Sequence, residues 1–156
     1  MIETALFDID GVLTDGAIYV DASGNESKRI LFVDIDALFE LKRSQIRIGF
    51  ITGEDSRFCE YVQNRFKPDV FLAGCKDKLA AFQDLANKGK VTTTTTCYAG
   101  DSRKDIELLR YLPISFAPSD AEELVKQAAK IVLHARRGEG VIREVVDHCL
   151  EGAKRI

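Results

Sequence analysis

Two aspartates, Asp8 and Asp10, stand one residue apart at the end of an apolar segment and are followed by Gly11. We expect that segment to be a β-strand, and alternate residues of a strand share a face, so both carboxylates are able to enter one cleft. One acid of such a pair is able to attack an electrophile while the other transfers protons, and both suit a hard cation. An acidic turn that closes a buried strand is the structural alternative, and the pair alone does not separate the two.

A hydroxyl group and backbone amides follow a second apolar segment. Thr52 and Gly53 come directly after residues 47–51, and the pattern predicts that a helix begins at Glu54. A hydroxyl together with free N–H groups at a helix N-terminus forms a phosphate site, although a threonine in this place also serves as an ordinary helix cap. These residues therefore indicate either a phosphate site or a cap.

Two further acids and a lysine complete the set. Asp101 and Asp105 follow residues 95–99 and open another expected helix, on which residues four apart share a face. Acids that face an acidic cleft repel one another unless a cation is present, and Mg²⁺ prefers oxygen ligands; alternatively, they complement the helix dipole. Lys78, at the start of a further expected helix, would supply the ammonium that a phosphate needs beside a carboxylate nucleophile, although Lys76 competes for this role and a lysine is more often a solvated surface charge.

The elements that must position these residues alternate along the chain. We expect strands at about 3–8, 46–51, 69–72, 95–99, 113–116 and 130–133, and helices at about 35–44, 54–65, 77–88, 103–111, 120–128 and 140–150. This order predicts an α/β fold with a Rossmann-like parallel sheet and helices on both faces. Residues 17–20 and 28–32 flank a turn-forming segment and predict a projecting β-hairpin. Carboxyl ends of parallel strands border a ligand crevice, where all the acids would meet.

In this order, the residues resemble the haloacid dehalogenase superfamily of phosphohydrolases. The match consists of the DxD motif at Asp8 and Asp10, then Thr52, Lys78 and the GDxxxD motif at residues 100–105. The resemblance implies that Asp8 is the nucleophile that becomes an aspartyl-phosphate. It also implies that Asp10 protonates the leaving oxygen and later activates water.

The same resemblance implies a set of ligand-binding residues. Phosphate would be bound by Thr52, Gly53 and Lys78, and Mg²⁺ by Asp8, Asp101 and the backbone carbonyl of Asp10. Behind these groups would stand Ser102 and Asp105, with Asp105 steadying Lys78 or a metal-bound water. A response-regulator receiver also phosphorylates an aspartate, but it carries its acid pair and its acceptor in a different order.

The spacing of the motifs leaves no room for a cap domain. The 44 positions from Asp8 to Thr52 hold the hairpin, one helix and one strand, and the 26 positions from there to Lys78 hold secondary structure alone. We therefore expect a single hydrolase domain over residues 1–156. Its open site suits a large substrate, or walls lent by a neighbouring subunit.

Among capless members, the chain is similar to phosphatases of sugar-acid phosphates, through residues 10–16, 24–26 and 137–144. This implies a phosphorylated sugar acid as substrate and a homotetramer assembled through the hairpins. Glu54 and Arg65 favour a nine-carbon keto-acid 9-phosphate, with KDO 8-phosphate as the alternative. A catalytically silent oligomerisation domain, related to that of CMP-acylneuraminate synthetases, is a second alternative. The cationic candidates for the substrate carboxylate are Arg65, Arg137 and Arg143.

Composition argues against several other classes of protein. The 22 Lys and Arg against 25 Asp and Glu give a net charge of −3 without a basic block, which disfavours nucleic acid and anionic membranes as partners. No apolar segment approaches membrane-spanning length, and the first residues do not resemble a signal peptide, so we expect a cytoplasmic protein. The four cysteines and two histidines complete no zinc motif, and we expect reduced thiols in or near the core.

Overall fold

One parallel sheet forms the centre of the molecule. The computed structural model describes residues 1–154, and the side chains of residues 1–151. The six strands lie in the order β5-β4-β1-β6-β7-β8, and every pairing is parallel. Their bounds are β1 (Thr4–Phe7), β4 (Arg47–Ile51), β5 (Val70–Leu72), β6 (Thr96–Ala99), β7 (Ile114–Ala117) and β8 (Ile131–Val132). All six strands expected from the sequence are confirmed. Within this part of the chain no helix has the length and apolar character needed to cross a membrane.

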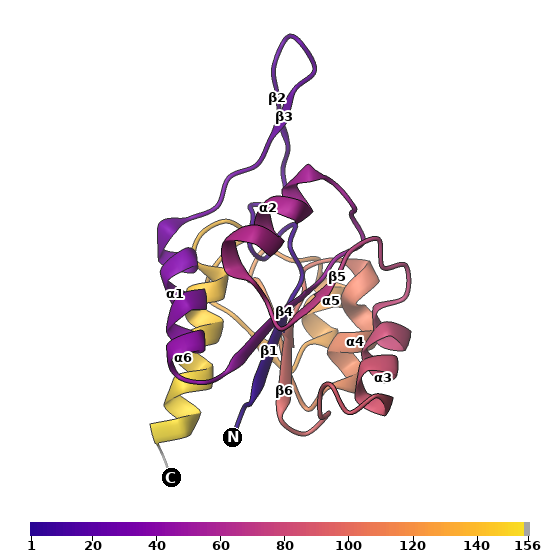
Figure 1. Ribbon diagram of the computed structural model, residues 1–156, viewed down its shortest axis with the longest axis vertical. Coiled ribbons are helices and arrows are strands. Elements are labelled where there is room, and N and C mark those ends of the chain that lie inside the picture. Colours follow the sequence, from indigo (N-terminus) through magenta and orange to yellow (C-terminus); the bar gives the residue numbers. More distant parts are fainter. Residues whose placement is uncertain (155–156) are drawn as a thin grey trace.

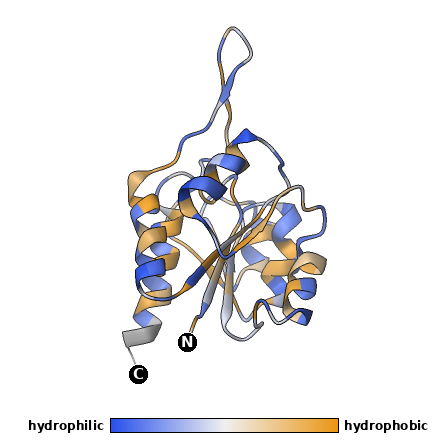
Figure 2. Ribbon diagram, in the orientation of Figure 1, coloured by the Kyte–Doolittle hydropathy of each residue, from blue (hydrophilic) through white to orange (hydrophobic). Residues whose placement is uncertain are grey.

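Helices cover both faces of the sheet, as Figure 1 shows. Side chains of β1 alternate between two cores: Ala5 and Phe7 pack with α1, α2 and α6, whereas Leu6 packs with α3, α4 and α5. Figure 2 shows bands of hydrophilic and hydrophobic residues on the outer helices, as expected for helices with one buried face. The bounds are α1 (Phe32–Arg43), α2 (Arg57–Phe66), α3 (Lys78–Asn87), α4 (Ile106–Tyr111), α5 (Glu123–Ala128) and α6 (Val141–Lys154). The α/β prediction is therefore confirmed.

A β-hairpin projects beyond the carboxyl ends of the strands (Figure 1). Its arms are β2 (Tyr19–Val20) and β3 (Glu26–Ser27), which pair antiparallel. The carboxylate of Asp21 accepts hydrogen bonds from the backbone amides of Ser23 and Asn25 and so closes the turn. Between β1 and α1 the described chain holds this hairpin and no separate cap.

Two predicted boundaries are wrong. The second hairpin arm is β3 rather than residues 28–32, because the carbonyl of Leu31 already accepts the first helical hydrogen bonds of α1. The helix expected from Glu54 begins three residues later, at Arg57. The backbone carbonyl of Glu54 instead accepts a hydrogen bond from the amide of Gly74, 2.9 Å away, so this loop is tied to the segment that precedes α3.

Candidate active site

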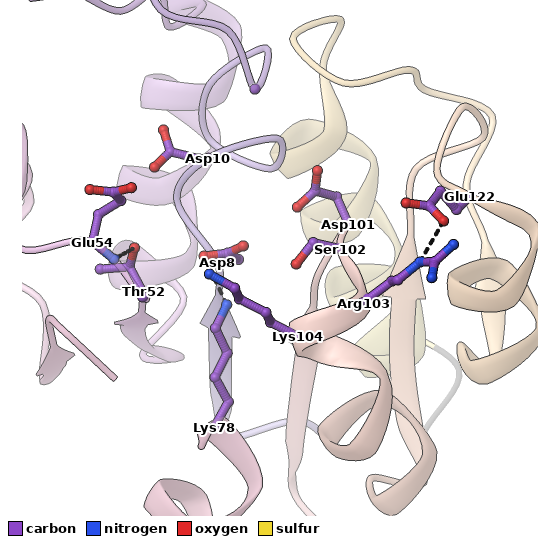
Figure 3. Close-up of a pocket in the computed structure, with 12 residues that line it drawn as sticks. Asp8, Asp10, Thr52, Glu54, Lys78, Asp101, Ser102, Arg103, Lys104 and Glu122 are labelled. Carbon is purple, nitrogen blue, oxygen red and sulfur yellow. Dashed lines mark hydrogen bonds and ion pairs between the residues drawn. The ribbon is translucent and has the colours of Figure 1, made fainter. Parts of the chain in front are cut away.

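The predicted residues converge at the carboxyl ends of β1, β4 and β6. Asp8 follows β1 directly, Thr52 follows β4, and Asp101 lies two residues beyond β6. Together they border a cavity of about 390 Å³ (Figure 3). The other predicted residues that line it are Asp10, Gly53, Glu54, Lys78 and Ser102.

Lys78, the first residue of α3, joins the acids in the floor of this cavity. Its Nζ lies 3.0 Å from Asp8 Oδ1 and 2.6 Å from Asp105 Oδ1, and it donates to the Tyr98 hydroxyl at 3.2 Å. Burial alone would lower the pKa of Lys78, but the two carboxylates outweigh burial and raise it. The ammonium therefore stays charged although only 3% of its side chain is exposed.

Asp105 acts as a brace rather than an open ligand. Its Oδ1 accepts from Lys78 and, at 2.6 Å, from the Tyr98 hydroxyl. Its Oδ2 accepts from the backbone amides of Asp101 and Ser102 and from the Ser102 hydroxyl, at 2.9 to 3.1 Å. Both oxygens are thus occupied, and they fix Lys78 and the loop after β6 in place.

Asp8 is buried with one oxygen held and the other accessible. Its Oδ1 accepts from the backbone amide of Ile9 at 2.8 Å and pairs with Lys78, whereas its Oδ2 has no hydrogen bond among the described residues. Burial, and then the charge of Asp105, raise the pKa of Asp8 to about 7, although Lys78 opposes this shift. A carboxylate so placed offers its Oδ2 to a group that enters the cavity.

The acids fit a hard divalent cation. Asp8, Asp101 and Asp105 each offer a carboxylate oxygen, and these oxygens lie within 4.8 Å of one another. Asp101 Oδ1 is buried without a hydrogen-bond partner, and burial followed by the charge of Asp105 raises the pKa of Asp101 to about 6. A cation would satisfy that oxygen and offset the repulsion. Because Asp105 is fully hydrogen-bonded, the side chains available to hold the ion are those of Asp8 and Asp101.

Asp10 occupies the mouth of the cavity, above Asp8 (Figure 3). Its Oδ1 lies 2.7 Å from the Nζ of Lys28, which follows the hairpin, and accepts a longer hydrogen bond from the Thr14 hydroxyl. The Lys28 ammonium also lies over the ring of Phe58, 5.2 Å from its centroid. Lys28 is a site residue that sequence reasoning missed, because no local pattern links positions 18 residues apart.

Thr52 presents a hydroxyl to the cavity from the end of β4. Its Oγ1 accepts from the backbone amide of Glu54 at 3.2 Å, and its own amide donates to the carbonyl of Leu72 at 2.9 Å. Since the oxygen already accepts, its hydrogen is free to point to an anion. The helix N-terminus expected at this place lies further along the chain, so the Thr52 hydroxyl and the Gly53 backbone amide remain as the donors.

Over 150 residues the chain is 32% identical to the 3-deoxy-D-manno-octulosonate 8-phosphate phosphatase of Haemophilus influenzae, covering 96% of this chain and 83% of that relative. The chain belongs to the haloacid dehalogenase superfamily of phosphatases. A family profile described as haloacid dehalogenase-like hydrolase matches residues 70–145. As a member of this superfamily, the chain is a phosphoric monoester hydrolase.

Solved structures of haloacid dehalogenase phosphatases share the fold. The 3-deoxy-D-manno-octulosonate 8-phosphate phosphatase of Moraxella catarrhalis, in complex with magnesium, phosphate and KDO, has a TM-score of 0.89 at 27% identity, covering 96% of this chain and 86% of that one. The cobalt-bound Haemophilus influenzae enzyme has a TM-score of 0.90 at 31% identity, covering 98% and 90%. Divalent metals therefore occur in structural neighbours of this phosphatase.

Three arginines are candidates for binding the substrate carboxylate. Among the described residues, Arg137 is the one of the three that approaches the site acids of this phosphatase. Its Nη1 lies 3.4 Å from Asp101 Oδ2. Arg65 is exposed on α2, with its guanidinium over the ring of Tyr61. Arg143 pairs with Glu40 at 2.7 Å and so ties α6 to α1. None of the three arginines lines the cavity, and Arg137 is connected to it through Asp101.

Gly11 gives a test of the acid cluster in this phosphatase. Its φ is +88°, and a Cβ there would lie 1.9 Å from Asp101 Oδ2. We expect Gly11→Ala to displace Asp101 and to lower kcat about 100-fold, as misplacement of a site group by about 1 Å does. Steady-state phosphate release measures the loss.

Gly89→Ala is the matched control for the backbone. Gly89 also has a positive φ, +66°, but a Cβ there would meet no atom within 4 Å. This variant carries a similar backbone strain without the clash, so its kcat should match that of the wild type. Equal kcat values for Gly11→Ala and Gly89→Ala would show that turnover does not depend on the position of Asp101.

Proposed function

We propose that the chain hydrolyses 3-deoxy-D-manno-octulosonate 8-phosphate, a sugar-acid phosphate monoester, through a phosphoryl intermediate on Asp8. The observation that carries the proposal is the buried Asp8 carboxylate, whose Oδ1 is fixed by Lys78 and whose Oδ2 is unengaged, with one of its oxygens within 4.8 Å of an Asp101 carboxylate oxygen. The names of the relatives support the eight-carbon substrate. The nine-carbon expectation has less support. Of the two residues that favoured it, Glu54 lines the cavity but Arg65 lies away from it, over the ring of Tyr61.

The reaction follows in two steps. Asp8 Oδ2 attacks the phosphorus, the bond to the sugar oxygen breaks, and Asp10 gives its proton to that oxygen. A water then attacks the phosphorus of the aspartyl-phosphate while Asp10 takes its proton, and cleavage of the bond to Asp8 releases inorganic phosphate. Lys28, whose Nζ lies 2.7 Å from Asp10 Oδ1, positions this carboxyl group at the mouth of the cavity.

The remaining residues bind and orient. Asp8, Asp101 and the backbone carbonyl of Asp10 would hold Mg²⁺, which when bound supplies positive charge that stabilises the phosphoryl oxygens. The phosphoryl oxygens are bound by Thr52, Gly53 and Lys78, with Ser102 and Asp105 supporting the loop and the ammonium.

We also propose that residues 1–156 act as one catalytic domain within a homotetramer. Exposed apolar side chains on the hairpin and at the start of α1 support this assembly, since such groups are usually covered by a partner. They include Ile18, Val20 and Phe32, which are 53%, 57% and 77% exposed. Walls from a neighbouring subunit would narrow the open cavity.

A panel of phosphate esters with Mg²⁺ tests the proposed substrate. We expect kcat/KM for octulosonate 8-phosphate to exceed that for nononate 9-phosphate and N-acetylneuraminate 9-phosphate about tenfold or more, the usual discrimination for one altered group. Preference for a nine-carbon acid would overturn the proposed substrate and support the nine-carbon keto-acid phosphate expected from the sequence. If none of the esters were hydrolysed and the protein formed a stable oligomer, the result would instead support a catalytically silent oligomerisation domain.

A further inference from the structure

The cations that line the cavity differ in how they are paired. Lys78 is held by two carboxylates, and the Nε of Arg103 lies 2.8 Å from Glu122 Oε2. Lys104 also lines the cavity, but it makes no ion pair or hydrogen bond with any described side chain. It is thus the lining cation whose charge no described protein group neutralises.

The position of Lys104 is fixed by its neighbours in the chain. It is the middle residue of the 3₁₀ helix η1 (Arg103–Asp105), whose last residue is anchored to Lys78, Tyr98 and the loop after β6. Figure 3 shows its side chain pointing from η1 into the cavity. Its Nζ lies 4.0 Å from the place that a Cβ on Gly53 would take. The side chain therefore reaches the loop that follows β4.

The charge of the cavity favours an anion contact at this place. Five acids line it, namely Asp8, Asp10, Glu54, Asp101 and Glu122, and of these Glu122 is paired with Arg103. A phosphate dianion that enters this acidic cavity is repelled, and the charge of Lys78 is already shared by two carboxylates. A further ammonium at the mouth would reduce this repulsion.

We propose that Lys104 contacts the substrate phosphoryl group at the Thr52–Gly53 loop, so that the phosphate lies between two ammonium groups. The inference rests on the proposed hydrolysis of a phosphate monoester. Proximity to Gly53 assigns the contact to the phosphoryl group rather than to the sugar carboxylate, because that loop carries the Thr52 hydroxyl and the Gly53 amide that are proposed to bind phosphate.

Affinity for inorganic phosphate, measured by calorimetry with Mg²⁺ present, tests the contact. We expect Lys104→Met to weaken phosphate binding about tenfold, the effect of one charge-assisted hydrogen bond. KM should rise by a similar factor for p-nitrophenyl phosphate and for octulosonate 8-phosphate, with a smaller change in kcat, and Lys104→Arg should restore both. Lys88→Met removes the same charge from the exposed end of α3 and should change neither quantity.

The outcomes separate this inference from the proposed function. Unchanged phosphate affinity in Lys104→Met would overturn the inference, and so would a KM effect confined to the ester that carries a carboxylate. If the wild type cleaved neither ester, the proposed function would fail, whereas the comparison of phosphate affinities would still decide whether Lys104 binds phosphate.

Discussion

Asp8→Asn is expected to lower phosphate release at least a thousandfold, roughly the scale on which removal of a nucleophile acts. The amide nitrogen or oxygen of asparagine does not attack phosphorus as a carboxylate does. The change keeps the shape of the side chain, so the hydrogen bond from the Ile9 amide to its oxygen should remain. Single-turnover and steady-state phosphate release should both report the loss.

The folding of the Asp8→Asn variant can be measured independently of its activity, through its unfolding temperature. Burial and the charge of Asp105 raise the pKa of Asp8 to about 7, so its ionised form is disfavoured in the folded, metal-free protein. A neutral asparagine removes that cost, and the unfolding temperature at pH 8 without metal should equal or exceed that of the wild type. Asp84→Asn, on the exposed side of α3, is the chemical control and should keep full activity. Turnover retained by Asp8→Asn would refute its assignment as the nucleophile.

The sequence was sufficient to predict the sheet and the meeting of the acids. Asp8, Thr52 and Asp101 each come within two residues of the end of a predicted strand, and parallel strands put their carboxyl ends on one edge. Those two facts place three groups without knowledge of any helix packing. The register of β1 with β4 and β6 then brings the three ends together.

Contacts made by long side chains could not be predicted in this way. Lys28 reaches Asp10 only because the hairpin returns over the cavity, and Arg143 turns to Glu40 because α6 packs on α1. The thiols of Cys97 and Cys149, 52 residues apart, lie 3.7 Å from each other for the same reason. Such contacts depend on how each helix is rotated on the sheet and on the path of each loop. Neither feature produces a periodic pattern in the amino-acid sequence.

Buried polar partners were missed for a related reason. Tyr98 lies in a strand whose four residues are all buried, yet its hydroxyl accepts a hydrogen bond from Lys78 and donates one to Asp105. Burial and the nearby carboxylates raise its pKa well above the ordinary value, so it remains a hydrogen-bond donor. A tyrosine two residues before a GDxxxD motif is the one signal that could have suggested this role.

Removal of the divalent metal is expected to abolish turnover and, above neutral pH, to lower stability. Asp8 and Asp101 have an ordinary pKa of 3.8, and in the folded protein without metal their pKa values are about 7 and about 6. Between pH 4 and 7 the native state therefore binds more protons than the unfolded chain. The free energy of unfolding should fall as pH rises through this window and level off above it.

Magnesium requires both carboxylates ionised, so its stabilising effect should have the opposite dependence on pH. At pH 5 protons compete for the site, and millimolar Mg²⁺ should leave the unfolding temperature unchanged. At pH 8 Mg²⁺ should raise the unfolding temperature by roughly 6–10 °C, as expected when the ligand concentration is about 100 times the Kd for a chain of this size. Burial also raises the pKa of Asp34 to about 6, but that group contributes equally with and without metal and cancels in the difference. Asp101→Asn should lose the magnesium shift at pH 8, and a shift that persisted there would place the ion elsewhere.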